Sequence, residues 1–258
     1  MLHLLTKGDL RHISGGYIYN RELVSALSNR GFSVTVHDIS SITVMQQTLA
    51  ELSVESCVIV DSIIADDFAN AYDTARHSLY VVYLCHLPLG LRPALTTEKQ
   101  DHLSTLEYQI LQRAQLVICT SEFTRDWLAR LSSNTQSLVV LPNASPAFTP
   151  PEPINQCKDG TVHLLCVANI LPTKGQLAVL EALGTLPDQS WHLHLVAGST
   201  ICDEDYLAQI HATIRTNNVE DQVSLKFDYA GSELMREYQQ ADVFVLATQF
   251  ETLSLIHI

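Results

Sequence analysis

Short apolar runs alternate along the chain with longer stretches in which apolar residues recur every three or four positions. The runs predict β-strands, and the longer stretches predict helices that bury one face. Six runs occupy the first part of the chain, at 1–6, 33–39, 57–60, 79–84, 116–119 and 137–141. Strands that alternate with helices in this way predict an α/β fold with a parallel, doubly wound sheet.

A change in composition follows the sixth run. Five prolines fall within twelve residues, at 142, 146, 150, 151 and 153, and proline suits neither a helix interior nor a central strand. Beyond them the alternation restarts, with strands expected at 162–167, 191–197, 223–227 and 242–247, a helix from about Lys174, and another capped by Ser232. We therefore expect a Rossmann-like domain at 1–145, a Pro-rich linker at 146–160 and a second Rossmann-like domain at 161–252.

The charge and the cysteines narrow the functional class. The 258 residues carry a net charge of −13. Residues 1–150 hold 10 basic and 14 acidic side chains, net −4, and residues 151–258 hold 5 and 14, net −9, which argues against nucleic acid binding. Six cysteines without C-x-x-C spacing indicate reduced thiols in a cytoplasmic protein, and neither a disulfide framework nor a metal site. No basic patch supports membrane association, although the helix that includes Arg21 and Arg30 leaves it open.

Two turns suggest phosphate binding. Residues 166–176, C-V-A-N-I-L-P-T-K-G-Q, predict a strand, a tight turn and a helix that starts at Lys174, and Ser14-Gly15-Gly16 follows the first strand in the same way. Such turns lie at the carboxyl ends of parallel strands, where N–H groups of a helix start attract anions. Asp61 and His86 stand at two further strand ends. The alternatives are an ordinary exposed lysine, glycines that serve backbone geometry alone, and a structural histidine.

Several segments, in this order, are similar to a family 4 glycosyltransferase of the GT-B fold. They are 14–27 (S-G-G-Y-I-Y-N-R-E-L-V-S-A-L), 116–128 (L-V-I-C-T-S-E-F-T-R-D-W-L), 140–144 (V-L-P-N-A), 167–175 and 241–252 (A-D-V-F-V-L-A-T-Q-F-E-T). The resemblance implies two Rossmann-like domains that face a cleft. It also implies a retaining, hexosyl-type transfer from a nucleotide-sugar donor to a saccharide, lipid or small-molecule acceptor, with no metal and no cofactor.

The resemblance assigns roles to particular residues. His86 and Glu251 correspond to side chains that contact the donor sugar, and Lys174 would neutralise the departing diphosphate in place of a metal. Gly15 and Gly16 would let the backbone approach the donor, since a Cβ there would crowd it. The family commonly has an arginine where this chain has Asn169, which can donate hydrogen bonds but carries no charge, so more of the charge stabilisation rests on Lys174.

The end of the sequence departs further from the family. The second glutamate of the E-x7-E signature would fall at position 259, so the second domain is expected to be incomplete, and residues 253–258, L-S-L-I-H-I, resemble a translated sequencing adapter. We expect this polypeptide to be poorly soluble or inactive. Three alternatives stay open: a non-catalytic sugar-nucleotide or partner-binding protein, a GT-B nucleotide-sugar epimerase, and a sugar phosphorylase. An NAD-dependent oxidoreductase is disfavoured, because S-G-G replaces the G-x-G-x-x-G fingerprint.

Overall fold

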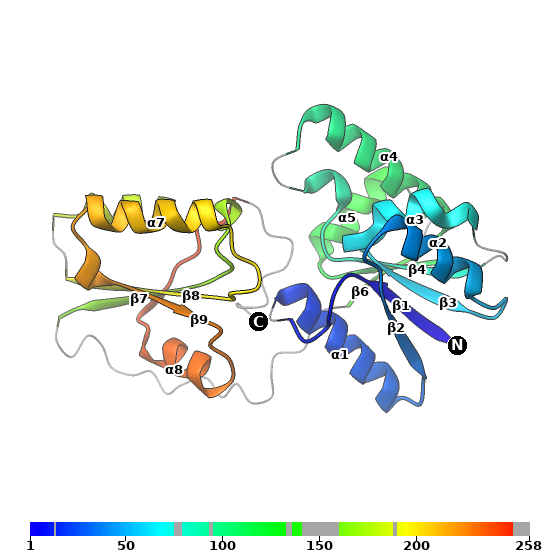
Figure 1. Ribbon diagram of the computed structural model, residues 1–258, viewed down its shortest axis with the longest axis horizontal. Coiled ribbons are helices and arrows are strands. Elements are labelled where there is room, and N and C mark those ends of the chain that lie inside the picture. The colour runs from blue at the N-terminus through cyan, green and yellow to red at the C-terminus, as the bar shows by residue number, and fades with distance from the viewer. Residues whose placement is uncertain are drawn as a thin grey trace. The chain divides into compact units, whose positions relative to one another are not determined.

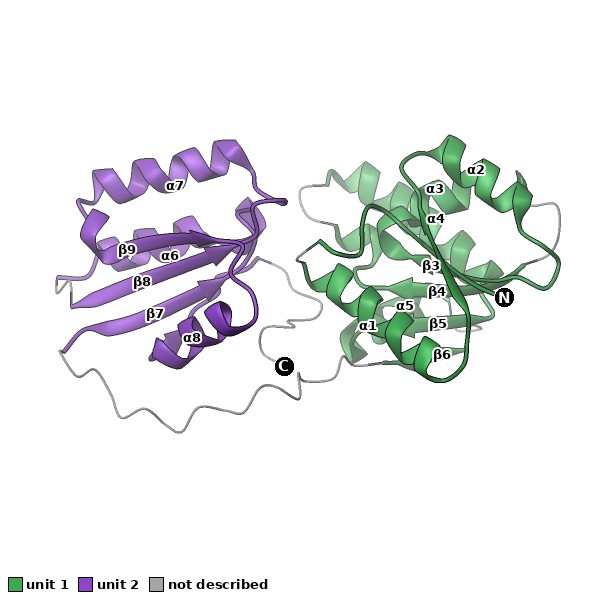
Figure 2. Cartoon of the chain, turned by 60° about the horizontal axis from the view of Figure 1, so that its bottom comes forward, with its two compact units in different colours: residues 1–143, 252–258 green, residues 144–251 purple. Residues whose placement is uncertain are grey.

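The chain divides into two compact units, Met1–Asn143 and Ala144–Glu251, coloured green and purple in Figure 2. In this computed structural model the described residues are 1–12, 14–74, 79–92, 95–132, 136–140, 160–187 and 190–249. Both units are built on parallel strands with connecting helices (Figure 1), so the predicted α/β fold class is confirmed.

The first unit contains a six-stranded sheet in the order β2-β1-β3-β4-β5-β6, in which every pair is parallel. Each of the six apolar runs forms a strand: β1 Leu2–Thr6, β2 Val34–Asp38, β3 Cys57–Asp61, β4 Tyr80–Cys85, β5 Leu116–Cys119 and β6 Ser137–Val139. Because all six strands run in one direction, their carboxyl ends share one edge of the sheet.

Helices cover both faces of this sheet. They are α1 Gly15–Asn29, α2 Ile42–Glu51, α3 Ala65–Ala71, α4 Thr97–Arg113 and α5 Glu122–Leu131, with 3-10 turns η1 Ser62–Ile64, η2 Tyr72–Thr74 and η3 Leu89–Leu91. Side chains of α1 pack on one face, against Leu4 and Val82, and those of α2 to α5 pack on the other. Serine or threonine side chains cap α2, α4 and α5, as is favoured at helix starts.

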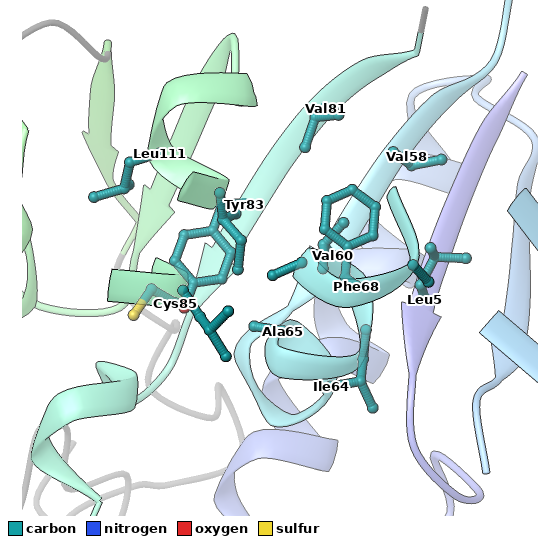
Figure 3. Packing of buried hydrophobic residues seen from close by; sticks show 14 of the residues in the cluster. Leu5, Val58, Val60, Ile64, Ala65, Phe68, Val81, Tyr83, Cys85 and Leu111 are labelled. Carbon is teal, nitrogen blue, oxygen red and sulfur yellow. The ribbon is translucent and has the colours of Figure 1, made fainter. Parts of the chain in front are cut away.

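The larger core of the first unit lies between the sheet and helices α2 to α5. Figure 3 shows Phe68 of α3 close to Leu5, Val58 and Val60, which come from neighbouring strands. The hydrophobic pattern did not identify α2 or α3. Helix α3 has seven residues, of which Ala65, Phe68, Ala69 and Ala71 are buried. Their spacing is helical, but the helix is shorter than the roughly 11 residues over which a helical period can be recognised.

The second unit has a four-stranded parallel sheet in the order β10-β7-β8-β9. Its elements are β7 Val162–Val167, η4 Pro172–Lys174, α6 Gln176–Gly184, β8 Trp191–Ala197, α7 Glu204–Thr216, η5 Glu220–Gln222, β9 Val223–Phe227, α8 Ser232–Gln240 and β10 Val243–Phe244. Helices α6 and α7 pack on one face through a shared core that includes Leu180, Ile210 and Leu193. Helix α8 lies against the opposite face (Figure 1).

Three boundaries differ from the sequence prediction. The strand expected at 242–247 pairs only over Val243–Phe244. The helix expected from Lys174 begins at Gln176, because Gly175 has a φ of 71° and interrupts the right-handed path. The prediction that Ser232 caps its helix is wrong: the residue before the helix is Gly231, with a φ of 52°, and Ser232 is the first helical residue.

Candidate functional site

A buried polar network lies at the carboxyl edge of the first sheet. The hydroxyl of Thr6, at the end of β1, donates to Asp61 Oδ2 at 2.8 Å, and Nδ2 of Asn20 in α1 donates to the same oxygen at 2.6 Å. Asn20 Oδ1 lies 2.9 Å from Nε2 of His86, directly after β4. Thr6, Asn20 and Asp61 are each at most 3% exposed. The network therefore joins three strand ends to the first turns of α1.

His86 is held by its backbone and by its ring. Its N–H donates to the hydroxyl of Ser62 at 3.1 Å, and the ring of Tyr19 meets the imidazole edge-on, with centroids 5.0 Å apart. Burial lowers the pKa of His86, and the neighbouring Asp61 carboxylate opposes that shift. The lowered pKa favours a neutral imidazole at neutral pH.

Gly15 and Gly16 are the first two residues of α1, behind Ser14, whose side chain makes no capping hydrogen bond. Gly16 does not have a positive φ, and a Cβ built on it would meet only the Cδ2 atom of His86, at 4.0 Å. Neither backbone geometry nor packing within the described chain therefore requires glycine at position 16. A small residue there keeps space beside the imidazole and next to the N–H groups of the helix start.

Glu107 of α4 forms hydrogen bonds to the segment that carries His86. The fully buried Glu107 carboxylate accepts from the Leu89 N–H, at 3.1 Å to each oxygen, and from the Tyr83 hydroxyl at 2.8 Å. Burial raises the pKa of Glu107 to about 7, opposed chiefly by the Leu89 hydrogen bond. The sequence contained a signal for this residue that we did not use, since Glu107 falls on the stripe of Leu103, Leu106 and Ile110.

The predicted diphosphate loop of the second unit forms a compact turn. Lys174 is half-buried at the end of η4, and Gly175 is the residue before α6. The side chain of Gln176, 1% exposed, donates to the backbone carbonyl of Asn169 at 2.9 Å and so closes the turn from inside. Glycine has no capping side chain at the start of α6. The Leu177 N–H donates to the Tyr206 hydroxyl at 3.1 Å, which leaves the N–H groups of Gln176 and Ala178 as the donors that this helix start directs toward an anion, next to a lysine.

The segment after β10 closes this turn from the other side. Thr173 accepts two hydrogen bonds at its carbonyl, from the Gln249 N–H at 2.9 Å and from the Thr248 hydroxyl at 3.0 Å. A Cβ on Gly175 would overlap the carbonyl oxygen of Ala247. The structure therefore brings together two of the segments that carry the family resemblance, 167–175 and 241–249.

The predicted site residues thus fall into two groups within the described chain. Gly15, Gly16 and His86 lie together in the first unit, and Asn169 and Lys174 lie together in the second. Glu251 and residues 253–258 lie outside the described residues. In the part of the chain that is described, no cluster of three or more His, Cys, Asp or Glu side chains is arranged to hold a metal ion. None of the described helices has both the length and the hydropathy to cross a bilayer.

Comparison with known proteins shows the fold of the chain and a family match over its second part. Residues 152–258 match the family model described as glycosyl transferases group 1. Sucrose-phosphate synthase (tll1590) from Thermosynechococcus elongatus superposes with a TM-score of 0.78 at 17% identity, over 99% of this chain and 77% of that one. The chain has the GT-B fold. This finding confirms the resemblance to GT-B glycosyltransferases.

Two further GT-B structures are similar. Anabaena Alr3699/HepE, solved with UDP and glucose, has a TM-score of 0.66 at 15% identity, over 99% of this chain and 76% of that one. The trehalose-6-phosphate synthase OtsA has a TM-score of 0.67 at 12% identity, with coverage of 99% and 80%. No protein of curated function matches the sequence itself. The family match and these neighbours together support a glycosyl transfer function.

Proposed function

We propose that this protein is a retaining glycosyltransferase that moves a hexosyl group from a nucleotide sugar to an acceptor without a bound metal. One observation carries the proposal: Lys174 and the start of α6 occupy a turn that is closed by hydrogen bonds from Thr248 and Gln249 to Thr173. This turn falls within the segment that matches glycosyl transferases group 1.

The proposed chemistry needs positive charge at the departing diphosphate. Lys174 supplies a cation, and the start of α6, through the N–H groups of Gln176 and Ala178, supplies fixed dipoles that need no rearrangement during the reaction. Asn169 adds hydrogen bonding in the same turn without charge. In the first unit, the proposed roles are hydrogen bonding to the donor sugar for His86 and close backbone approach for Gly15 and Gly16.

UDP-glucose is the donor that we would test first. Alr3699/HepE was solved with UDP and glucose, and the names of two other neighbours are those of enzymes that make sugar phosphates. A UDP-hexose as donor and a saccharide or sugar phosphate as acceptor are therefore the substrate classes that these likenesses favour. At 17% identity or less, they do not choose among individual sugars.

The test measures UDP-glucose binding by calorimetry and UDP release with and without candidate acceptors. Lys174→Ala should lower kcat by roughly 10²-fold or more, the usual loss when one charge-stabilising contact is removed, and Lys174→Arg should retain part of the activity. Lys99→Ala, an equal loss of charge on the exposed part of α4, is the matched control. Equal turnover by the Lys174→Ala and Lys99→Ala proteins would refute the role of Lys174.

A second candidate is a protein that binds sugar nucleotides without transferring the sugar. Asn169 favours it, because an uncharged residue in the diphosphate turn weakens leaving-group stabilisation but still permits donor binding. Tight UDP-glucose binding that depends on Lys174, without UDP release with any acceptor, would favour this candidate. Isomerised donor in the absence of acceptor would instead indicate an epimerase.

A further inference from the structure

We propose that Asp61 and Asn20 fix the imidazole of His86 in the tautomer that carries its hydrogen on Nε2, which makes Asn20 a positioning residue for His86. The inference concerns a hydrogen position in the first unit. Its functional consequence rests on the proposed glycosyl transfer, but the tautomer itself can be measured without any activity.

The chain of hydrogen bonds that orients His86 begins at Asp61. Three donors converge on its carboxylate: the Thr6 hydroxyl at 2.8 Å, Nδ2 of Asn20 at 2.6 Å, and the backbone N–H of Ile63 at 2.9 Å to the other oxygen. Asp61 is 3% exposed, so water does not substitute freely for these donors. A carboxylate can only accept hydrogen bonds, and this arrangement therefore defines which side of Asn20 must face it.

The Asp61 carboxylate determines the orientation of the Asn20 side-chain amide. If its amide were turned around, its carbonyl oxygen would lie 2.6 Å from a carboxylate oxygen, and two acceptors at that distance repel. The NH₂ group therefore faces Asp61, and the carbonyl oxygen faces Nε2 of His86 at 2.9 Å. Because that oxygen can only accept, Nε2 must donate. Asn20 is 1% exposed, and its buried amide is costly to leave unsatisfied in any other orientation.

The tautomer determines what His86 can offer to a ligand. A neutral imidazole with its hydrogen on Nε2 has a lone pair on Nδ1, so Nδ1 can accept a hydrogen bond but cannot donate one. A group that approaches Nδ1, such as a hydroxyl of a donor sugar, must therefore approach it as a donor. The edge-on contact with Tyr19 and the backbone hydrogen bond to Ser62 hold the ring in one orientation. The ring nitrogen that donates and the one that accepts are therefore fixed before a ligand binds.

The decisive measurement is the tautomer of His86 by long-range ¹H–¹⁵N NMR, assigned by the signals that disappear in His86→Gln. The wild-type protein should show a pyrrole-type nitrogen at Nε2 and a pyridine-type nitrogen at Nδ1. Asn20→Leu should convert this into a mixture of tautomers. Thr6→Val removes a different donor to the same Asp61 oxygen and, at Asn20, only a long contact of 3.4 Å to Nδ2, while the 2.6 Å bond from Nδ2 to Asp61 remains. This variant should leave the pattern unchanged. Wild-type protein protonated at Nδ1, or an unchanged pattern in Asn20→Leu, would overturn the proposal.

Kinetics then separates this inference from the proposed function. With UDP-glucose and an active acceptor, Asn20→Leu should lose about 10-fold in kcat, the worth of one hydrogen bond, and Asn20→Asp should not restore it. If the tautomer is as proposed but no donor or acceptor supports transfer, the proposed function fails and the positioning stands. If Asn20→Leu does not fold, the wild-type spectrum alone decides the tautomer and Asn20→Ser replaces it in the comparison.

Discussion

The substitution Gly175→Ala tests the geometry of the diphosphate turn. Gly175 has a φ of 71°, which costs a non-glycine residue about 1 kcal/mol or more. An added Cβ would also overlap the Ala247 carbonyl oxygen and lie 2.7 Å from its carbonyl carbon. The overlap must displace the backbone, which loosens the two hydrogen bonds to Thr173 at about 1 kcal/mol each and adds about 1–3 kcal/mol of overpacking. The expected loss of stability is therefore about 4–6 kcal/mol.

Gly31→Ala is the matched control. Gly31 has a φ of 86°, but a Cβ there would meet nothing within 4 Å, so only the conformational cost of about 1 kcal/mol applies. The only tryptophans, Trp127 and Trp191, lie in different units. Trp191 fluorescence in a Trp127→Phe background reports unfolding of the second unit, and Trp127 in a Trp191→Phe background reports the first. A Gly175→Ala protein no less stable than Gly31→Ala, by guanidinium denaturation, would refute the reasoning from steric overlap.

Two further predictions concern pH. Glu107 has a pKa of about 7 in the folded state, against an ordinary 4.5. Protonated Glu107 therefore contributes up to about 3 kcal/mol to the free energy of unfolding below pH 4.5, and this contribution is lost as the pH rises to 7. Glu107→Gln should remove this dependence, and denaturation midpoints between pH 4.5 and 8 that fall equally in both proteins would contradict it. The pKa of His194 is lowered from 6.5 to about 4, mainly by burial and secondly by the charge of the neighbouring His192. The contribution of neutral His194 to the free energy of unfolding, about 3 kcal/mol at most, is present above pH 6.5 and lost as the pH falls to 4. In His194→Gln, the stability of the second unit, followed by Trp191 fluorescence, should fall less between pH 6.5 and pH 4. An equal fall in the variant and the wild type would refute the assignment.

The positions of the strands along the chain follow from local pattern. Each predicted strand of the first unit is present. The central strands β3 and β4 are buried and therefore apolar over several consecutive residues, a pattern that the sequence displays directly, whereas the edge strands β2 and β6 are largely exposed. Turns with glycine or proline were located for the same reason. Element ends were less accurate: the helix near Lys174 starts two residues later, because Gly175 is left-handed. The close approach of Ala247, 72 positions away, leaves no room for a Cβ at this position.

The sequence by itself determined the residue types of the candidate site: Lys174 and Asn169 in a turn after a strand, Gly15 and Gly16 at a helix start, and His86 at a strand end. The tertiary structure decided which residues act on them. Thr6, Asn20, Asp61 and His86 are separated by up to 80 positions, and only the parallel sheet brings their strand ends to one edge. The orientation of Asn20, and with it the tautomer of His86, depends on angstrom-scale distances among these groups, which no local pattern of residues encodes.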